Sequence, residues 1–158
     1  GDCAATVKLM DALVIAGLAM AECGNSRPAS GSEHHMSHFL EMDFVSRGEK
    51  IPMHGIKVAI GTLISMEIYS YLKREKIQFE GCREVYKLVE ALPSIETIEK
   101  MLEKIGCPTR FSQIGVREET FVDMIYNAYI VRDRYTVLTL IKEIGLSDKI
   151  LPIVKKYY

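Results

Sequence analysis

Hydrophobic and polar positions along the chain follow a helical pattern from end to end. Apolar residues recur at intervals of three and four, in segments bounded by Gly, Pro and Ser. No run of alternating β-branched residues lies between turn signals, so a sheet is not expected. The pattern predicts an all-α helical bundle. Its expected helices cover residues 4–22, 32–45, 54–73, 81–92, 95–106, 117–131, 135–144 and the stretch from 147 onward.

The predicted helix over residues 54–73 has almost no polar face, so we expect it at the centre of the fold. Two of its charged residues, Lys57 and Glu67, are expected at the rim or in solvent rather than in catalysis. The apolar positions that leave so little polar face are Val58, Ile60, Leu63, Ile64, Ile68 and Leu72.

Serine residues mark the expected starts of three helices. Ser32, followed by Glu33 in the first turn, is expected to cap the second helix. Ser94 and Ser147 have the same place before the fifth and the last helix. The last helix is expected to break near Pro152.

The first helix has the most apolar sequence. Its longest apolar run, residues 12–21, is preceded by Lys8 and Asp11. A bilayer requires about 20 apolar residues, so this run is too short to cross one and suits a buried core helix. A helix that is apolar on nearly all sides needs cover on all sides, and we therefore expect the chain to be a piece of a longer protein.

Composition narrows the functional class. The chain has 158 residues, 48% of them hydrophobic, which is enough for one domain with a real core. The net charge of −1 favours neither nucleic acid nor an anionic membrane as a partner. The four cysteines form no CxxC pair, and a reducing cytoplasm is the expected compartment.

All four histidines fall within residues 34–54. His34 and His38 are four residues apart on one face of a predicted helix, and glycine-containing breaks at residues 24–31 and 52–55 flank the segment. Gathered imidazoles of this kind suggest a metal or proton-transfer site. The alternative is a chance cluster of surface rings, each simply hydrogen-bonded.

Two basic segments are candidates for binding an anion. The loop over residues 24–31 precedes a helix N-terminus and contains Arg27, although it could equally be a plain turn. Arg132 and Arg134 flank Asp133, and their guanidinium groups suit a carboxylate or a phosphate. The alternative there is an ion pair at a helix end.

Three stretches of the chain, residues 24–42, 53–63 and 130–138, closely resemble the sn-glycerol-1-phosphate dehydrogenases. These belong to the superfamily of metal-dependent alcohol dehydrogenases, glycerol dehydrogenases and dehydroquinate synthases. The resemblance implies a two-domain enzyme. Residues 1–158 would form its all-helical, metal- and substrate-binding C-terminal domain, and the N-terminal α/β domain that binds the nicotinamide would be absent from this chain.

The resemblance also implies roles for the histidines. The family's first histidine ligand, in the SGSEH motif, falls on His34, and its second, in the HG motif that opens a helix, falls on His54. His38 takes the place of a residue used in substrate contact or proton transfer. His35 is expected to point off that face and not to be a ligand.

The ligand set implied by the family is not complete in this sequence. The family uses an aspartate well before the first histidine, and neither Asp2 nor Asp11 matches it. Zinc is the favoured metal, and nickel and iron are compatible with such ligands. From charge alone, Arg27, Lys57 and Arg134 are candidates for binding the substrate phosphate.

The implied activity is reduction of glycerone phosphate to sn-glycerol 1-phosphate by NADH or NADPH, in phospholipid biosynthesis. We expect the isolated chain to be inactive and the full-length protein to be a cytoplasmic homo-oligomer without nucleic-acid or membrane partners. Two alternatives stay open. One is a glycerol dehydrogenase-type domain acting on unphosphorylated polyol, and the other is a free-standing helical module that binds without catalysis.

Overall fold

The computed structural model describes residues 2–158. It divides into two compact units, Gly1–Gly31 and Ser32–Tyr158, which are described separately. Within the described residues the regular structure consists of eight α helices and four short 3-10 turns, without a strand. The all-α class predicted from the sequence is confirmed.

The first unit is one long helix, α1 (Cys3–Cys23), followed by a 3-10 turn, η1 (Arg27–Ala29). The carboxylate of Asp2 caps the helix by accepting a hydrogen bond from the backbone N–H of Ala4 at 2.9 Å. Gly24 ends the helix in the left-handed conformation, with φ of 64°, where the absence of a Cβ removes the steric cost.

Helix α1 differs from the buried core helix expected for this segment. None of its described residues is buried, and Ile15 and Leu18 are each 65% exposed. The apolar run over residues 12–21 also underestimated the length of this helix, because the 21-residue α1 continues through Lys8 and Asp11. Helix α1 is long and apolar enough to cross a membrane. Core helices of soluble proteins and signal sequences meet the same two criteria.

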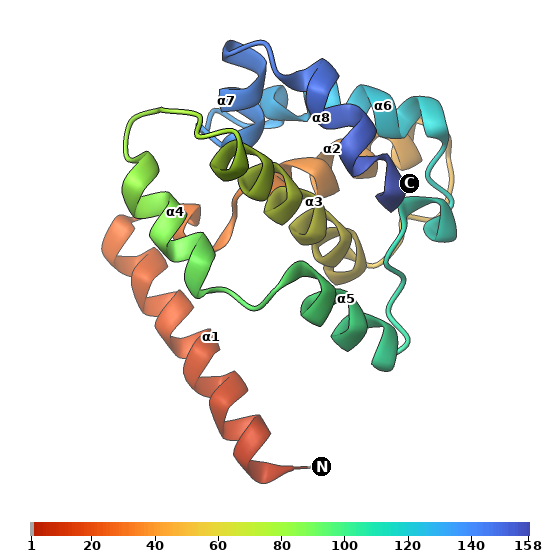
Figure 1. Ribbon diagram of the computed structural model, residues 1–158. Helices are drawn as coiled ribbons and strands as arrows, with labels where there is room; N and C mark the ends of the chain where they lie inside the picture. The colour runs from red at the N-terminus through yellow and green to blue at the C-terminus, as the bar shows by residue number, and fades with distance from the viewer. Residues whose placement is uncertain (1) are drawn as a thin grey trace. The chain divides into compact units, whose positions relative to one another are not determined.

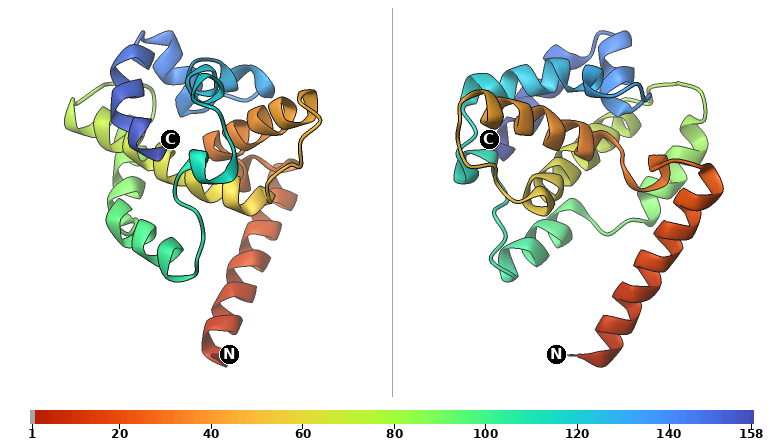
Figure 2. Two further views of the ribbon diagram at one scale, coloured as in Figure 1. Left: turned by 90° about the vertical axis from the view of Figure 1, so that its right-hand side faces the viewer. Right: turned by 180° about the vertical axis from the view of Figure 1, so that it is seen from behind.

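The second unit is built around α3 (His54–Arg74), which contacts α2, α4, α5, α7 and α8. Helices α6, α7 and α8 gather on one side of α3, and α4 and α5 lie on the other (Figures 1 and 2). The other helices of this unit are α2 (Ser32–Ser46), α4 (Cys82–Ala91), α5 (Ile95–Lys104), α6 (Glu118–Asn127), α7 (Val137–Glu143) and α8 (Ser147–Val154).

The central place of α3 confirms the prediction from its apolar pattern. Of the six apolar positions, Val58 alone keeps partial exposure. Helix α2 packs especially close to α3 at Gly61, where an added Cβ would lie 3.0 Å from both the Cα and the carbonyl oxygen of Glu33. The other five of the six apolar positions of α3 are fully buried: Ile60, Leu63, Ile64, Ile68 and Leu72.

The three serines predicted as helix caps have different roles. Ser94 caps α5 as expected, since its hydroxyl accepts a hydrogen bond from the N–H of Thr97 at 3.2 Å. Ser32 instead lies within α2, and its buried hydroxyl pairs with that of Ser65 at 2.7 Å. The close packing of α2 on α3 places this serine between the helices, where its hydroxyl meets α3.

Ser147 is also not a cap. It is the first residue of α8, Leu146 has the cap position, and the buried hydroxyl of Ser147 has no hydrogen-bond partner among the described residues. The predicted break near Pro152 is likewise absent, because α8 continues through it to Val154. Only one helical N–H is lost at a proline, and α8 ends within a turn of it.

Candidate functional site

Three of the four histidines come together where α2 passes the start of α3. We call His34, His38 and His54 the histidine cluster. His34 and His38 lie one turn apart on α2, and His54 is the first residue of α3. The ring centroids of His34 and His54 are 5.2 Å apart, and those of His38 and His54 are 5.7 Å apart. The predicted shared face is thus confirmed, and α3 adds the third ring to it.

The carboxylate of Glu41 lies against this cluster. Its Oε1 accepts hydrogen bonds from Nζ of Lys57 at 2.8 Å and from Nδ1 of His54 at 3.2 Å. Its Oε2 accepts from Nδ1 of His38 at 3.1 Å. Burial raises the pKa of Glu41, but the hydrogen bonds from Lys57, His54 and His38 outweigh it and lower the pKa to about 2. The sequence reasoning did not include Glu41.

The hydrogen bonds decide which ring nitrogens stay available. An ionised carboxylate only accepts hydrogen bonds, so an imidazole nitrogen beside it has to carry the proton. Nδ1 of His34 lies 2.7 Å from Oε1 of Glu33, and Nδ1 of His54 lies 3.2 Å from Oε1 of Glu41. Each ring therefore keeps a lone pair on Nε2. A histidine held by a carboxylate in this way is typical of metal ligands.

The donor set fits part of a metal site. Within residues 2–158, no group of three or more His, Cys, Asp or Glu side chains is placed to hold a metal ion. A catalytic zinc site commonly has three protein ligands and one open position. His34 and His54 match two of these three in chemistry, and no third such ligand is placed beside them among the described residues.

Of the two charged residues of α3 expected at the rim or in solvent, Lys57 is buried and Glu67 is partly exposed. Lys57 is fully buried, because its aliphatic stem packs inside the unit while Glu41 compensates its charge. Glu67 has a side chain only 15% exposed and accepts hydrogen bonds from the Tyr157 hydroxyl at 3.0 Å and from Lys156. The expectation of a rim or solvated position was wrong for Lys57, whereas the partly exposed Glu67, paired with the exposed Lys156, lies at the rim as expected.

Arg132 reaches the histidine cluster, although the sequence-based choice was Arg134. The 3-10 turn η3 (Ala128–Val131) packs on α2 and leads directly to Arg132, whose Nη2 lies 2.9 Å from Nε2 of His38. A guanidinium only donates, so Nε2 of His38 accepts and its Nδ1 carries the proton. The Arg-Asp-Arg motif was the available signal, but it could not show which arginine faces the histidines.

Arg134 and Arg27 are, with Lys57, the residues expected from their charge to bind the substrate phosphate. Arg134 is half-buried, and its charge acts on His35. Arg27 belongs to the first unit, in η1, so its role stays a prediction.

His35 is separate from the histidine cluster. It is fully buried, and neither ring nitrogen has a well-formed hydrogen bond to a described residue. Burial lowers the pKa of His35, the backbone of Ala128 opposes this, and the charges of Arg134 and Arg132 lower it further. His35 thus faces the interior, where the lowered pKa favours its uncharged form, and its exclusion from the ligands stays a prediction.

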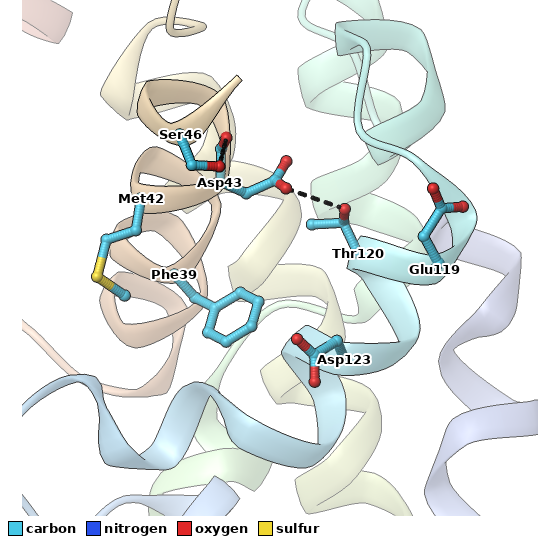
Figure 3. Close-up of a pocket in the computed structure, with 7 residues that line it drawn as sticks. All are labelled: Phe39, Met42, Asp43, Ser46, Glu119, Thr120 and Asp123. Atoms are coloured by element: carbon cyan, nitrogen blue, oxygen red, sulfur yellow. Dashed lines mark hydrogen bonds between the residues drawn. The ribbon is translucent and has the colours of Figure 1, made fainter. Parts of the chain in front are cut away.

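A hollow of about 520 Å³ lies on another face of α2, between it and α6 (Figure 3). Across it, the hydroxyl of Thr120 donates a hydrogen bond to Oδ1 of Asp43 at 3.3 Å. No member of the histidine cluster contributes to its lining, so the two features are distinct. The lining residues are Phe39, Met42, Asp43, Ser46, Glu119, Thr120 and Asp123.

Comparison with known proteins places this chain in a family. No family model matches the chain. A glycerol-1-phosphate dehydrogenase (NAD(P)+) of Bacillus licheniformis is 34% identical over 145 residues, which are 91% of this chain and 36% of that protein. The proteins of the same name from Bacillus velezensis and Staphylothermus marinus are 36% and 35% identical, over 85% and 89% of this chain. The chain spans about a third of the length of these curated relatives.

The helical fold and these similarities define the chain as a domain of an oxidoreductase family. Its family is that of the glycerol-1-phosphate dehydrogenases, to which the chain belongs as a C-terminal helical domain.

Proposed function

We propose that residues 1–158 form the metal- and substrate-binding domain of an enzyme that interconverts glycerone phosphate and sn-glycerol 1-phosphate with NAD(P)H. One observation supports this most strongly. His34 and His54 lie side by side, each with Nδ1 bonded to a carboxylate and Nε2 left to bind a metal. The names of the relatives supply the reaction class.

His34 and His54 would hold the metal, with zinc favoured and nickel or iron compatible. A metal held there would supply Lewis-acid chemistry, which polarises a substrate carbonyl and favours negative charge on its oxygen. A third ligand, such as the family's aspartate, would come from outside this chain. The nicotinamide would bind to an N-terminal α/β domain, so the isolated chain should be inactive.

His38 would handle the proton. Its Nδ1 is occupied by Glu41, so exchange with the substrate has to take place at Nε2. Arg132 covers that atom in the structure. A substrate phosphate would compete for the guanidinium, because an arginine prefers an anionic oxygen to a neutral nitrogen. Phosphate binding would thereby release Nε2 of His38 to exchange a proton with the substrate oxygen.

The phosphate site is therefore assigned first to Arg132. Lys57 stays a candidate from sequence alone, but its full burial and its bond to Glu41 favour a role in holding that carboxylate. Arg27 and Arg134 stay candidates as well. A cytoplasmic location, a role in phospholipid biosynthesis and a homo-oligomeric full-length enzyme are further parts of the proposal.

The test is substrate preference of the metal-loaded full-length protein. We expect NAD(P)H-dependent reduction of glycerone phosphate to be much faster than oxidation of glycerol. Comparable rates, or a preference for glycerol, would favour a glycerol dehydrogenase-type domain instead. No dehydrogenase activity with either substrate would favour a helical module without catalysis.

A further inference from the structure

Glu41 joins the two helices that make up the histidine cluster. Helix α2 contributes Ser37 and Glu41, one turn apart, and α3 contributes His54 and Lys57, also one turn apart. Oε1 of Glu41 lies within 3.2 Å of the donor nitrogens of both α3 residues. The carboxylate therefore receives hydrogen bonds across the helix pair.

The surroundings of Nδ1 of His54 permit one tautomer. The Ser37 hydroxyl donates to Oε1 of Glu41 at 3.4 Å, and its oxygen lies 3.2 Å from Nδ1 of His54. Because the serine proton points to the carboxylate, Nδ1 faces acceptors on both sides. A neutral His54 ring then carries its proton on Nδ1, the tautomer that free histidine in water populates less.

We propose that Glu41, anchored by the buried ammonium of Lys57, is a positioning residue that holds His54 in the Nδ1–H tautomer and presents its Nε2 outward. This inference rests on the metal-binding function proposed above, because the Nδ1–H tautomer leaves the Nε2 lone pair of His54 to bind the metal. Lys57 fixes the carboxylate without a competing solvent contact, because no part of its side chain is exposed. Glu41 acts through His54 and is not itself a ligand.

His38 provides an internal reference. Glu41 bonds its Nδ1 as well, but Arg132 donates to its Nε2 at 2.9 Å. Loss of Glu41 would leave the Arg132 contact, and His38 would stay in the Nδ1–H tautomer. Removing Glu41 should therefore change His54 and leave His38 as it is.

The experiment is long-range ¹H–¹⁵N NMR of the imidazoles in the metal-free chain at about pH 8.5, two units above the usual imidazole pKa of about 6.5. The variant is Glu41→Leu with Lys57→Met, which removes both charges together so that no buried ammonium is left unpaired. The matched control is Glu33→Leu, which removes the carboxylate beside His34 but leaves Glu41 in place.

In the wild-type chain, the Nδ1–H signature is expected for His54. In the double variant, Ser37 is free to donate to Nδ1, and His54 should convert mainly to the Nε2–H tautomer. In Glu33→Leu, His54 should keep its wild-type signature. An unchanged His54 in a folded double variant would overturn the proposal, as would an Nε2–H tautomer in the wild-type chain.

A second readout separates this inference from the proposed function. Zn²⁺ titration of the full-length double variant should show affinity weakened roughly 10- to 100-fold, as for other groups that orient a ligand histidine. A wild-type protein without Zn²⁺ affinity would refute the metal-binding function, while the tautomer result in the metal-free chain would still decide the role of Glu41. Unchanged Zn²⁺ affinity in the double variant would contradict that role.

Discussion

Nζ of Lys57 lies 2.8 Å from Oε1 of Glu41, and the two side chains differ in burial: Lys57 is fully buried, whereas Glu41 is 28% exposed. Removing Glu41 should therefore lower the free energy of unfolding more than removing Lys57. Glu41→Leu leaves a buried ammonium unpaired and should lower the free energy of unfolding by about 3–5 kcal/mol. Lys57→Met leaves a carboxylate that still contacts water and two imidazoles, and should cost only about 1–2 kcal/mol.

Urea denaturation of the two single variants and of the double variant measures this difference. The double variant should recover most of the loss, because an apolar pair of similar volume replaces a buried ion pair at little cost. Equal losses in the two single variants, or additive losses in the double variant, would show that Lys57 does not depend on Glu41.

Glu41 should also shape the acid stability of the domain. Its pKa falls from 4.5 to about 2 on folding, so the unfolded chain binds the proton more readily. The stabilisation is fully present above pH 4.5 and is lost as the pH falls from 4.5 towards 2. Denaturation curves between these values should show a steeper loss for the wild-type chain than for Glu41→Leu with Lys57→Met. Parallel curves would contradict the lowered pKa.

The contact between α2 and α3 at Gly61 should tolerate no larger residue. A methyl group there would press on the Cα and carbonyl oxygen of Glu33, and backbone atoms cannot turn aside. Gly61→Ala should therefore destabilise the domain by about 1–3 kcal/mol. Thermal denaturation with Gly55→Ala as the control measures it. Gly55 is in the first turn of the same helix with open space around it, and alanine there should stabilise by about 0.4–1 kcal/mol. A neutral Gly61→Ala would mean that the helices lie further apart.

Arg132 and Arg134 can be separated by kinetics of the full-length enzyme. Loss of a charged hydrogen bond to phosphate costs about 1.5–3 kcal/mol, so Arg132→Gln should raise KM for glycerone phosphate roughly 10- to 100-fold. Arg134→Gln, in the same segment, should have a smaller effect. A larger increase in KM for Arg134→Gln than for Arg132→Gln would instead assign the phosphate to Arg134, the candidate from sequence alone.

Sequence reasoning located most helices because their signals are local. The apolar pattern of α3 and the Ser94 cap of α5 both depend on neighbouring residues. The serines at positions 32 and 147 have the same local signal, yet their hydroxyls turn into the unit. Tertiary packing decides that choice, and the sequence near each serine does not contain it.

The candidate site was likewise predictable where its signals are local in the sequence. Helical spacing places His34 and His38 on one face, and the break before residue 54 starts α3 at His54. Glu41 was missed, and Arg134 was preferred to Arg132, because the roles of Glu41 and Arg132 depend on contacts across 13 and 94 residues of sequence. Lys57 was misplaced because a charged residue is usually exposed, and its burial follows from a partner on another helix.

The most direct test of the metal site is the metal content of the full-length protein and two matched variants. His54→Ala removes a proposed ligand, and His35→Leu removes a buried histidine whose nitrogens have no well-formed hydrogen bond to a described residue. Metal analysis after purification should find metal in the wild-type protein and in His35→Leu, and almost none in His54→Ala. Full metal content in a folded His54→Ala protein would contradict the account.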